Sequence, residues 1–141
     1  MAGKILLEVV TPEKLLLSQQ VDEVIAPGSE GEFGVLPGHC HFLSTLRIGE
    51  LRYRVGDRTF HMAVLWGYAE VTPERVTIMA EIAEKAEDID VGRAQAAVES
   101  AERRLKAGGL PSELKEAEIS LEKARLRKKL AERHQGRASH V

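Results

Sequence analysis

Up to about Ala86, hydrophobic and polar residues alternate with a period of two, which is typical of β-strands. In the first such segment Ile5, Leu7 and Val9 alternate with Lys4, Leu6 and Glu8, and Leu6 gives this segment the pattern of a strand buried on both sides. Further segments of this kind are 21–26, 41–48, 50–55, 59–65, 68–71 and 75–80. Turn-forming residues accompany them at Pro27-Gly28, Gly49, Gly56-Asp57, Gly67 and Pro73-Glu74. Short strands with closely spaced turns predict an antiparallel β-sandwich, or a related barrel, over residues 1–86.

After Ile82 the hydrophobic period changes to that of a helix. One stripe consists of Val91, Ala94, Val98, Ala101 and Leu105, and a second of Leu114, Ala117, Leu121 and Ala124. Asp88 or Asp90 can cap the first helix, Gly108-Gly109 ends it, and Pro111 begins the second. The pattern predicts a domain of residues 87–141 that consists of an antiparallel two-helix hairpin. The overall class is therefore β plus α.

Alanine occupies about every second position of this hairpin seam. Burying a leucine or valine contributes about 1.5–3 kcal/mol, whereas an alanine contributes far less. One interpretation is that the hairpin is held weakly, so that ligands can shift its population. The other is that alanine only lets two helices pack closely. The sequence leaves both open.

The composition indicates an ordinary soluble protein. The 141 residues are 43% hydrophobic and 30% charged, and no apolar run approaches the roughly 20 residues of a spanning helix. We expect no direct membrane insertion and no signal peptide. The single cysteine, Cys40, cannot form an internal disulfide, which fits a reducing compartment.

The net charge of −2 conceals an asymmetry between the two predicted domains. Residues 123–137 carry seven basic side chains and one acidic side chain, whereas the first 86 residues carry eight basic and twelve acidic ones. A basic end favours an acidic partner or a polyanion. The alternative is an ordinary solvated helix face.

His39-Cys40-His41 resembles a metal site or a nucleophile with its base. A metal needs three or four convergent ligands, and alternation along a strand would point Cys40 away from both histidines. We therefore expect neither metal binding nor thiol catalysis here. The chain also lacks a Gly-rich phosphate loop and a Gly-x-Ser-x-Gly elbow, so no motif supports an enzyme. Nucleic-acid binding is disfavoured because the aromatic residues that could stack on bases lie in the predicted sandwich.

Three stretches resemble the epsilon subunits of bacterial F-type ATP synthases. They are GSEGEFGVLPGHCHFLSTL (28–46), RVTIMAEIAEKAEDIDVGRA (75–94) and AERRL (101–105). The resemblance spans nearly the whole chain, and the order of sandwich and hairpin agrees with it. It implies a non-catalytic subunit of the rotary central stalk, peripheral to the membrane on the cytoplasmic face of the bacterial inner membrane.

The resemblance also implies partners and contact residues. The sandwich would bind the gamma subunit and rest on the c-ring of a proton-translocating synthase. Glu32 and His39 would contribute, on or beside a loop that spans Gly34 to His39. Cys40 and His41 depart from the family pattern of a small residue followed by proline. The hairpin would inhibit ATP hydrolysis by extending toward acidic residues of the catalytic beta subunits in the alpha/beta assembly. The basic residues expected to make this contact are Lys123, Arg125, Arg127, Lys128 and Lys129.

Some bacterial members of that family bind ATP on the folded hairpin, and this implies an alternative function as an ATP-sensing module. The corresponding residues here are Glu84, Ile89, Asp90, Arg93, Ala94, Lys123 and Arg127. Ser100 and Lys123 stand where strong binders have arginine, and lysine lacks the planar fork that grips phosphate. We therefore expect weak ATP binding or none, and no cofactor is required. The structural alternative is that Asp90 caps the helix and Arg93 forms an ion pair.

Overall fold

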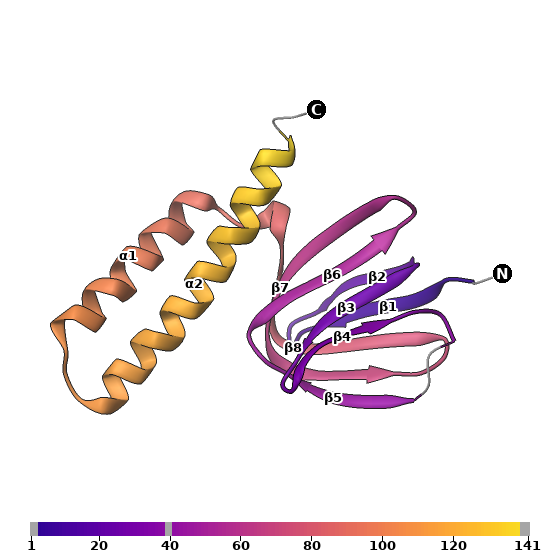
Figure 1. The fold of residues 1–141 in the computed structure, drawn as a ribbon, viewed down its shortest axis with the longest axis horizontal. Coiled ribbons are helices and arrows are strands. Elements are labelled where there is room, and N and C mark those ends of the chain that lie inside the picture. Colours follow the sequence, from indigo (N-terminus) through magenta and orange to yellow (C-terminus); the bar gives the residue numbers. More distant parts are fainter. Residues whose placement is uncertain (1–2, 39–40, 139–141) are drawn as a thin grey trace. The chain divides into compact units, whose positions relative to one another are not determined.

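The computed structural model describes residues 3–38 and 41–138 (Figure 1). Contacts divide the chain into two compact units, one ending at Glu84 and the other beginning at Lys85. The first unit is built of strands and the second of helices. Each is described by itself below.

The strands are numbered in chain order. They are β1 (Ile5–Val10), β2 (Leu15–Val21), β3 (Glu23–Gly28), β4 (Gly31–Val35), β5 (Phe42–Leu46), β6 (Gly49–Val55), β7 (Arg58–Val71) and β8 (Arg75–Lys85). A 3-10 turn, η1 (Ala86–Asp88), is followed by α1 (Val91–Ala107) and α2 (Pro111–Ala138).

The eight strands form one continuous sheet that folds over on itself around a single core. Its order is β2-β1-β8-β7-β5-β3-β4, and β6 closes the gap between β3 and β7. The sandwich prediction is confirmed, with one correction: β1 and β8 pair in parallel, with Leu7 opposite Val76. Local alternation cannot reveal this pairing, because it joins the first and last strands of the unit across about 70 residues of sequence.

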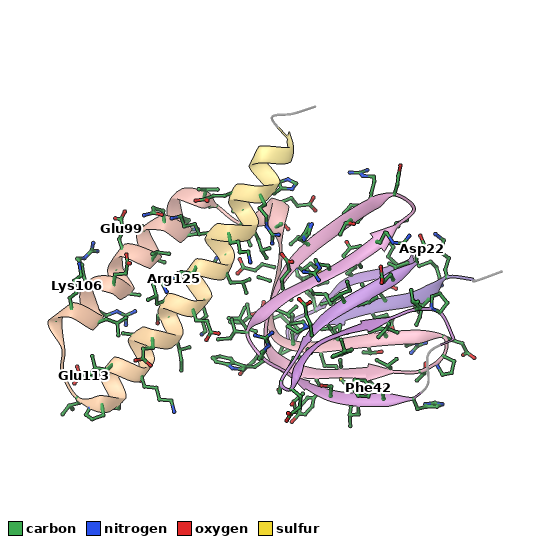
Figure 2. All side chains as sticks on the ribbon, viewed as in Figure 1. Asp22, Phe42, Glu99, Lys106, Glu113 and Arg125 are labelled. Atoms are coloured by element: carbon green, nitrogen blue, oxygen red, sulfur yellow. The ribbon has the colours of Figure 1, made fainter. Side chains whose placement is uncertain are left out.

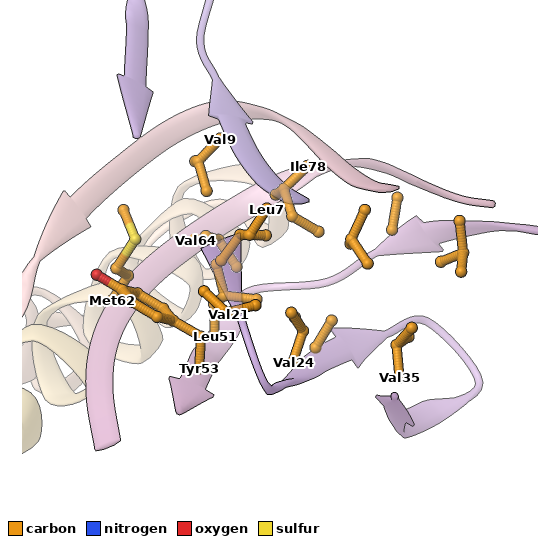
Figure 3. Packing of buried hydrophobic residues seen from close by; sticks show 14 of the residues in the cluster. Leu7, Val9, Val21, Val24, Val35, Leu51, Tyr53, Met62, Val64 and Ile78 are labelled. Atoms are coloured by element: carbon orange, nitrogen blue, oxygen red, sulfur yellow. The ribbon is translucent and has the colours of Figure 1, made fainter. Parts of the chain in front are cut away.

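The core is formed by the side chains of one face of each strand. Along β1, Ile5, Leu7 and Val9 are fully buried, whereas the residues between them are only half-buried. Tyr53 stacks on Phe60 with ring centroids 5.1 Å apart. Figure 3 shows how Leu7, Leu51, Ile78 and their neighbours fill the interior. Side chains this well buried contribute about 1.5–3 kcal/mol each, which is what holds the strands in register.

Gly67 does not form a turn, as the sequence predicted, but lies inside the long strand β7. The first part of β7 pairs with β6, up to Val64, and its last part pairs with β5, from Gly67 onward. Between them Trp66 and Gly67 both have positive φ, at 50° and 140°. The two residues form a kink at which β7 changes its partner strand from β6 to β5. The sequence correctly indicated an irregular backbone at Gly67, but the prediction of a turn there is wrong.

Strands β2 and β4 were missed, and several strand boundaries differ from the prediction. Residues 15–21 form β2, an edge strand that the sequence analysis missed because three leucines followed by Ser18, Gln19 and Gln20 do not alternate. Gly34 and Val35, expected in a loop, are the end of β4. The strand expected at 21–26 is β3, which instead runs on through Pro27 and Gly28. Strand β8 continues to Lys85, past the change of period at Ile82.

Asp22 ties the start of β1 to the turn between β6 and β7 (Figure 2). Its Oδ1 lies 2.8 Å from Lys4 Nζ, and Gly56 donates its backbone N–H to Oδ2 at 2.6 Å. These two hydrogen bonds and the positive charges of Lys4 and Arg54 lower the pKa of Asp22 below its usual value of 3.8.

The substitution Asp22→Asn is expected to lower the stability of the sandwich in a pH-dependent way. A carboxylate with a lowered pKa contributes stability above its unfolded-state pKa, and this stability is lost as the pH falls through the folded-state pKa. Urea unfolding should therefore show a lower midpoint for Asp22→Asn than for the unaltered chain at pH 7. The two midpoints should match at a pH low enough to protonate Asp22 of the unaltered chain in both its folded and its unfolded state. Asp57→Asn, in the same turn, is the control. Equal midpoints for Asp22→Asn and the unaltered chain at pH 7 would contradict the prediction.

The second unit is the predicted antiparallel hairpin. Asp90 is the N-cap of α1, and its Oδ1 accepts from the backbone N–H of Arg93 at 2.9 Å. The C-cap Gly108 has a φ of 76°, which a glycine adopts without strain. The predicted stripes meet, since Val98, Ala101, Leu121 and Ala124 form one buried cluster with Leu105 against it.

Candidate functional site

The predicted c-ring contact residue Glu32 lies on β4 and is held by an arginine from another strand. Arg52 of β6 places Nη2 3.2 Å from Glu32 Oε1 and Nη1 3.1 Å from Glu50 Oε1. Burial works against the charge of Arg52, but the two carboxylates outweigh it and raise the pKa of Arg52 above its ordinary value. The sequence did not identify Arg52. Only the pairing of both β4 and β6 with β3 brings it to Glu32.

Glu50 also approaches a histidine. His61 Nδ1 lies 3.4 Å from Glu50 Oε2, and both side chains are mostly buried. The carboxylates of Glu32 and Glu50 thus alternate with the guanidinium of Arg52 and the imidazole of His61. This row gives the sheet face beside Glu32 a fixed set of charges.

The rest of the predicted loop is only partly described. His39 and Cys40 lie outside the described residues, as does His140. Pro37-Gly38 forms the expected turn, with Gly38 at a φ of 82° and its N–H donating to Pro73 O at 2.9 Å. His41 is exposed. Within residues 3–38 and 41–138, no group of three or more potential metal ligands converges.

The residues of the predicted ATP motif cluster around the first turn of α1. Ile89 and Ala94 are buried, whereas Asp90 and Arg93 are exposed. One carboxylate oxygen of Asp90 is already used by the helix cap. Lys123 and Arg127 are half-buried and one turn apart on α2, and Glu84 is in the strand unit. ATP binding by these residues stays a prediction.

The other predicted basic residues face a groove between the two helices. Its α2 side is formed by Arg125, Lys128, Lys129, Glu132 and Arg133, and its α1 side by Gln95, Val98 and Glu102. We call this the basic groove. Arg125, which is labelled in Figure 2, places Nη2 3.8 Å from Glu102 Oε2 across the two helices. Within α2, Lys128 Nζ lies 3.9 Å from Glu132 Oε1. The sequence identified three of its cations but neither Arg133 nor the residues of α1.

The strand unit carries a second hollow, which is apolar. It is lined by Val10, Thr11, Pro12, Thr45, Leu46, Trp66, Gly67, Tyr68, Met79, Ala80 and Glu81. We call it the apolar groove; its volume is about 610 Å³. Trp66, Tyr68 and Met79 are unusually exposed for large apolar side chains, at 37%, 54% and 41%. A contiguous exposed apolar surface of this kind is a mark of protein–protein contact. The apolar groove could not be predicted from the sequence, because its residues come from four separate segments.

Two family models match consecutive parts of the chain. The β-sandwich domain of the ATP synthase delta/epsilon chain matches residues 4–86, and the long α-helix domain of that chain matches residues 87–132. The chain belongs to the ATP synthase delta/epsilon family.

Individual members of the family match over most of their length. The ATP synthase epsilon chain of Syntrophobacter fumaroxidans is 56% identical over 133 residues, which are 94% of this chain and 99% of the relative. That of Geobacter metallireducens is 49% identical over 134 residues, covering 93% and 96%. The family expected from the sequence is confirmed. So is the expectation that the chain is no enzyme, since the epsilon chain is a non-catalytic subunit of the central stalk.

Solved structures of the family agree with the fold. A chain in the cryo-EM structure of the Euglena gracilis mitochondrial ATP synthase, OSCP/F1/c-ring, superposes with a TM-score of 0.78 at 25% identity, over 89% of this chain and 79% of that one. A chain of the Tetrahymena thermophila mitochondrial ATP synthase central stalk/c-ring gives a TM-score of 0.64 at 14% identity, over 92% and 98%, and shows the fold alone. No helix among the described residues of this family member is long and apolar enough to cross a bilayer.

Proposed function

We propose that this chain couples the rotor of a proton-translocating F-type ATP synthase to its c-ring and inhibits ATP hydrolysis through its helical hairpin. The observation that carries the proposal is the division into two units with different chemistry. A strand unit with its own apolar core offers binding surfaces, and a helical unit is held by a seam of small side chains. In the cell the chain would lie on the cytoplasmic face of the bacterial inner membrane as a peripheral protein.

The apolar groove is our choice for the gamma contact. Trp66 and Tyr68 supply large, rigid side chains of the kind that dominates binding energy at interfaces. The c-ring contact is assigned to Glu32 together with His39, with Arg52 holding the carboxylate of Glu32 in place. An exposed carboxylate held by one arginine keeps acceptor sites for the polar loop of a c subunit.

The hairpin would inhibit by leaving its folded state and extending α2 toward the alpha/beta assembly. Lys123, Arg125, Arg127, Lys128 and Lys129 then meet acidic side chains of beta. In the folded hairpin the ion pairs of Arg125 and Lys128 are long, at 3.8 and 3.9 Å, and partly exposed, and surface pairs contribute about 0–1 kcal/mol each. Exchanging Glu102 and Glu132 for carboxylates on beta therefore costs little free energy. The attraction between the basic residues of α2 and beta should weaken as the salt concentration rises.

The test is inhibition of an ATPase complex that lacks its epsilon subunit. The full chain should lower the rate of ATP hydrolysis, and a chain of residues 1–86 should bind gamma yet leave the rate unchanged. The triple variant Arg125→Gln, Lys128→Gln and Lys129→Gln should raise the inhibition constant about tenfold or more, since it removes three charge contacts. The control is Arg103→Gln, Arg104→Gln and Lys106→Gln, which removes the same charge from exposed positions of α1. Full inhibition by the chain of residues 1–86 would contradict the hairpin mechanism.

A further inference from the structure

The basic groove carries more positively than negatively charged side chains. Four cations of α2 line it at spacings of three, one and four residues: Arg125, Lys128, Lys129 and Arg133. These spacings place all four along one side of the helix. From α1, Gln95 adds an amide and Val98 an apolar floor. The groove has a volume of about 590 Å³ and is open to solvent.

Two carboxylates share the groove with the four cations. Glu102 faces Arg125 at 3.8 Å and Glu132 faces Lys128 at 3.9 Å. Both distances are too long for good charge-assisted hydrogen bonds, which are about 2.7–2.9 Å. Arg125 and Glu102 are also largely exposed, at 63% and 47% of their side-chain surface. The carboxylates of Glu102 and Glu132 can therefore turn into solvent at little cost when a stronger anion enters. The electrostatic potential in the groove is then set by the four cations and is positive.

The groove is separate from the ATP motif of the first turn of α1. With about 3.6 residues per turn, Gln95 and Glu102 lie on one side of the buried stripe of α1, and Arg93 lies on the other. On α2, Arg125 and Lys129 likewise lie on the groove side of Leu121 and Ala124, whereas Arg127 lies opposite. A ligand in the groove would contact neither Arg93 nor Arg127.

We propose that the basic groove binds a compact polyanion that carries two or more linked phosphate groups. The two arginines offer planar forks that match phosphate oxygens, and the two lysines offer mobile point charges between them. Both helices line the groove, so the bound polyanion stabilises the closed hairpin. If the proposed contact with beta holds, the polyanion also occupies three of its cations and relieves inhibition. Binding itself does not depend on that contact.

The test uses the full chain alone and inorganic tripolyphosphate as the probe. In a titration followed by ¹H–¹⁵N NMR, the largest shifts should fall on residues 95–102 and 125–133. The variant Arg125→Gln with Lys129→Gln should weaken tripolyphosphate binding about tenfold, because two charge-assisted contacts are lost. Orthophosphate should bind much more weakly than tripolyphosphate.

The matched control is Arg93→Gln with Lys123→Gln, which removes one arginine and one lysine from the motif side. It should change the dissociation constant less than about twofold, a small free-energy change. A larger loss in this control than in the groove variant would overturn the proposal and place the anion on the motif. Equal losses in both variants would overturn it as well, since net charge alone would then explain binding. Absence of shifts at 95–102 and 125–133 would overturn it directly.

Discussion

Replacing Gly67 with alanine is expected to lower the free energy of unfolding of the strand unit by more than about 3 kcal/mol, or to prevent folding. Gly67 has a φ of 140°, a backbone conformation that side chains resist. A Cβ at this position would collide with the backbone carbonyl of Met79 and lie 2.9 Å from Ala80 Cα. Because these are backbone atoms of the neighbouring strand β8, the collision cannot be relieved by a side-chain rotation. Thermal or urea unfolding followed by circular dichroism would measure the loss.

Gly56→Ala is the matched control for this prediction. Gly56 also has a positive φ, at 63°, but no atom lies within 4 Å of the place where its Cβ would stand. Only the backbone penalty applies there, about 1–2 kcal/mol. If Gly67→Ala lowered the free energy of unfolding no more than Gly56→Ala does, the claim that β7 lies too close to β8 at this kink to admit a Cβ would be contradicted.

The second large effect is expected from enlarging an alanine of the hairpin seam. Ala101 is fully buried between α1 and α2, against Val98, Leu121 and Ala124. A leucine there adds three carbon atoms to a close contact, which costs about 1–3 kcal/mol of packing strain. The folded hairpin should lose population by about 5- to 150-fold relative to open states. Reconstituted with an ATPase that lacks epsilon, Ala101→Leu should inhibit hydrolysis more strongly than the unaltered chain, since more of it is free to extend.

Ala96→Leu provides the control on the same helix. Ala96 is exposed, so a leucine there adds the same atoms without entering the seam. Helicity and inhibition should both match those of the unaltered chain, while the sandwich melts normally in both variants. Equal inhibition by Ala101→Leu and Ala96→Leu would show that opening of the hairpin does not limit inhibition.

In the hairpin, the start and end of α1 and the start of α2 could be predicted from the sequence almost to the residue, whereas the end of α2 at Ala138 could not. Its stripes, its Asp90 cap and its Gly108 stop all depend on neighbours within about four positions. A helix can be predicted from such local signals, because its backbone hydrogen bonds and its neighbouring side chains all lie within about one turn along the chain.

The strand unit was predicted less well, because strands pair with segments that can be far away in the sequence. The edge strand β2 lacks alternation in its sequence, and the kink at Gly67 resembles a turn until β6 and β5 are seen to pair with the two parts of β7. Likewise, Arg52 joins Glu32 only because β4 and β6 both pair with β3, which brings together two residues that are 20 positions apart. Strand partners are set by long-range contacts, which a local pattern does not encode.

The sequence by itself determined the class, the order of the two units, the buried stripes and the identity of the basic residues. The tertiary structure alone decided the parallel β1–β8 pairing, the apolar groove and which residues of α1 line the basic groove together with those of α2. The physical reason is the same in each case. Periodicity fixes which face of an element is buried, whereas a binding surface depends on which faces of different elements meet.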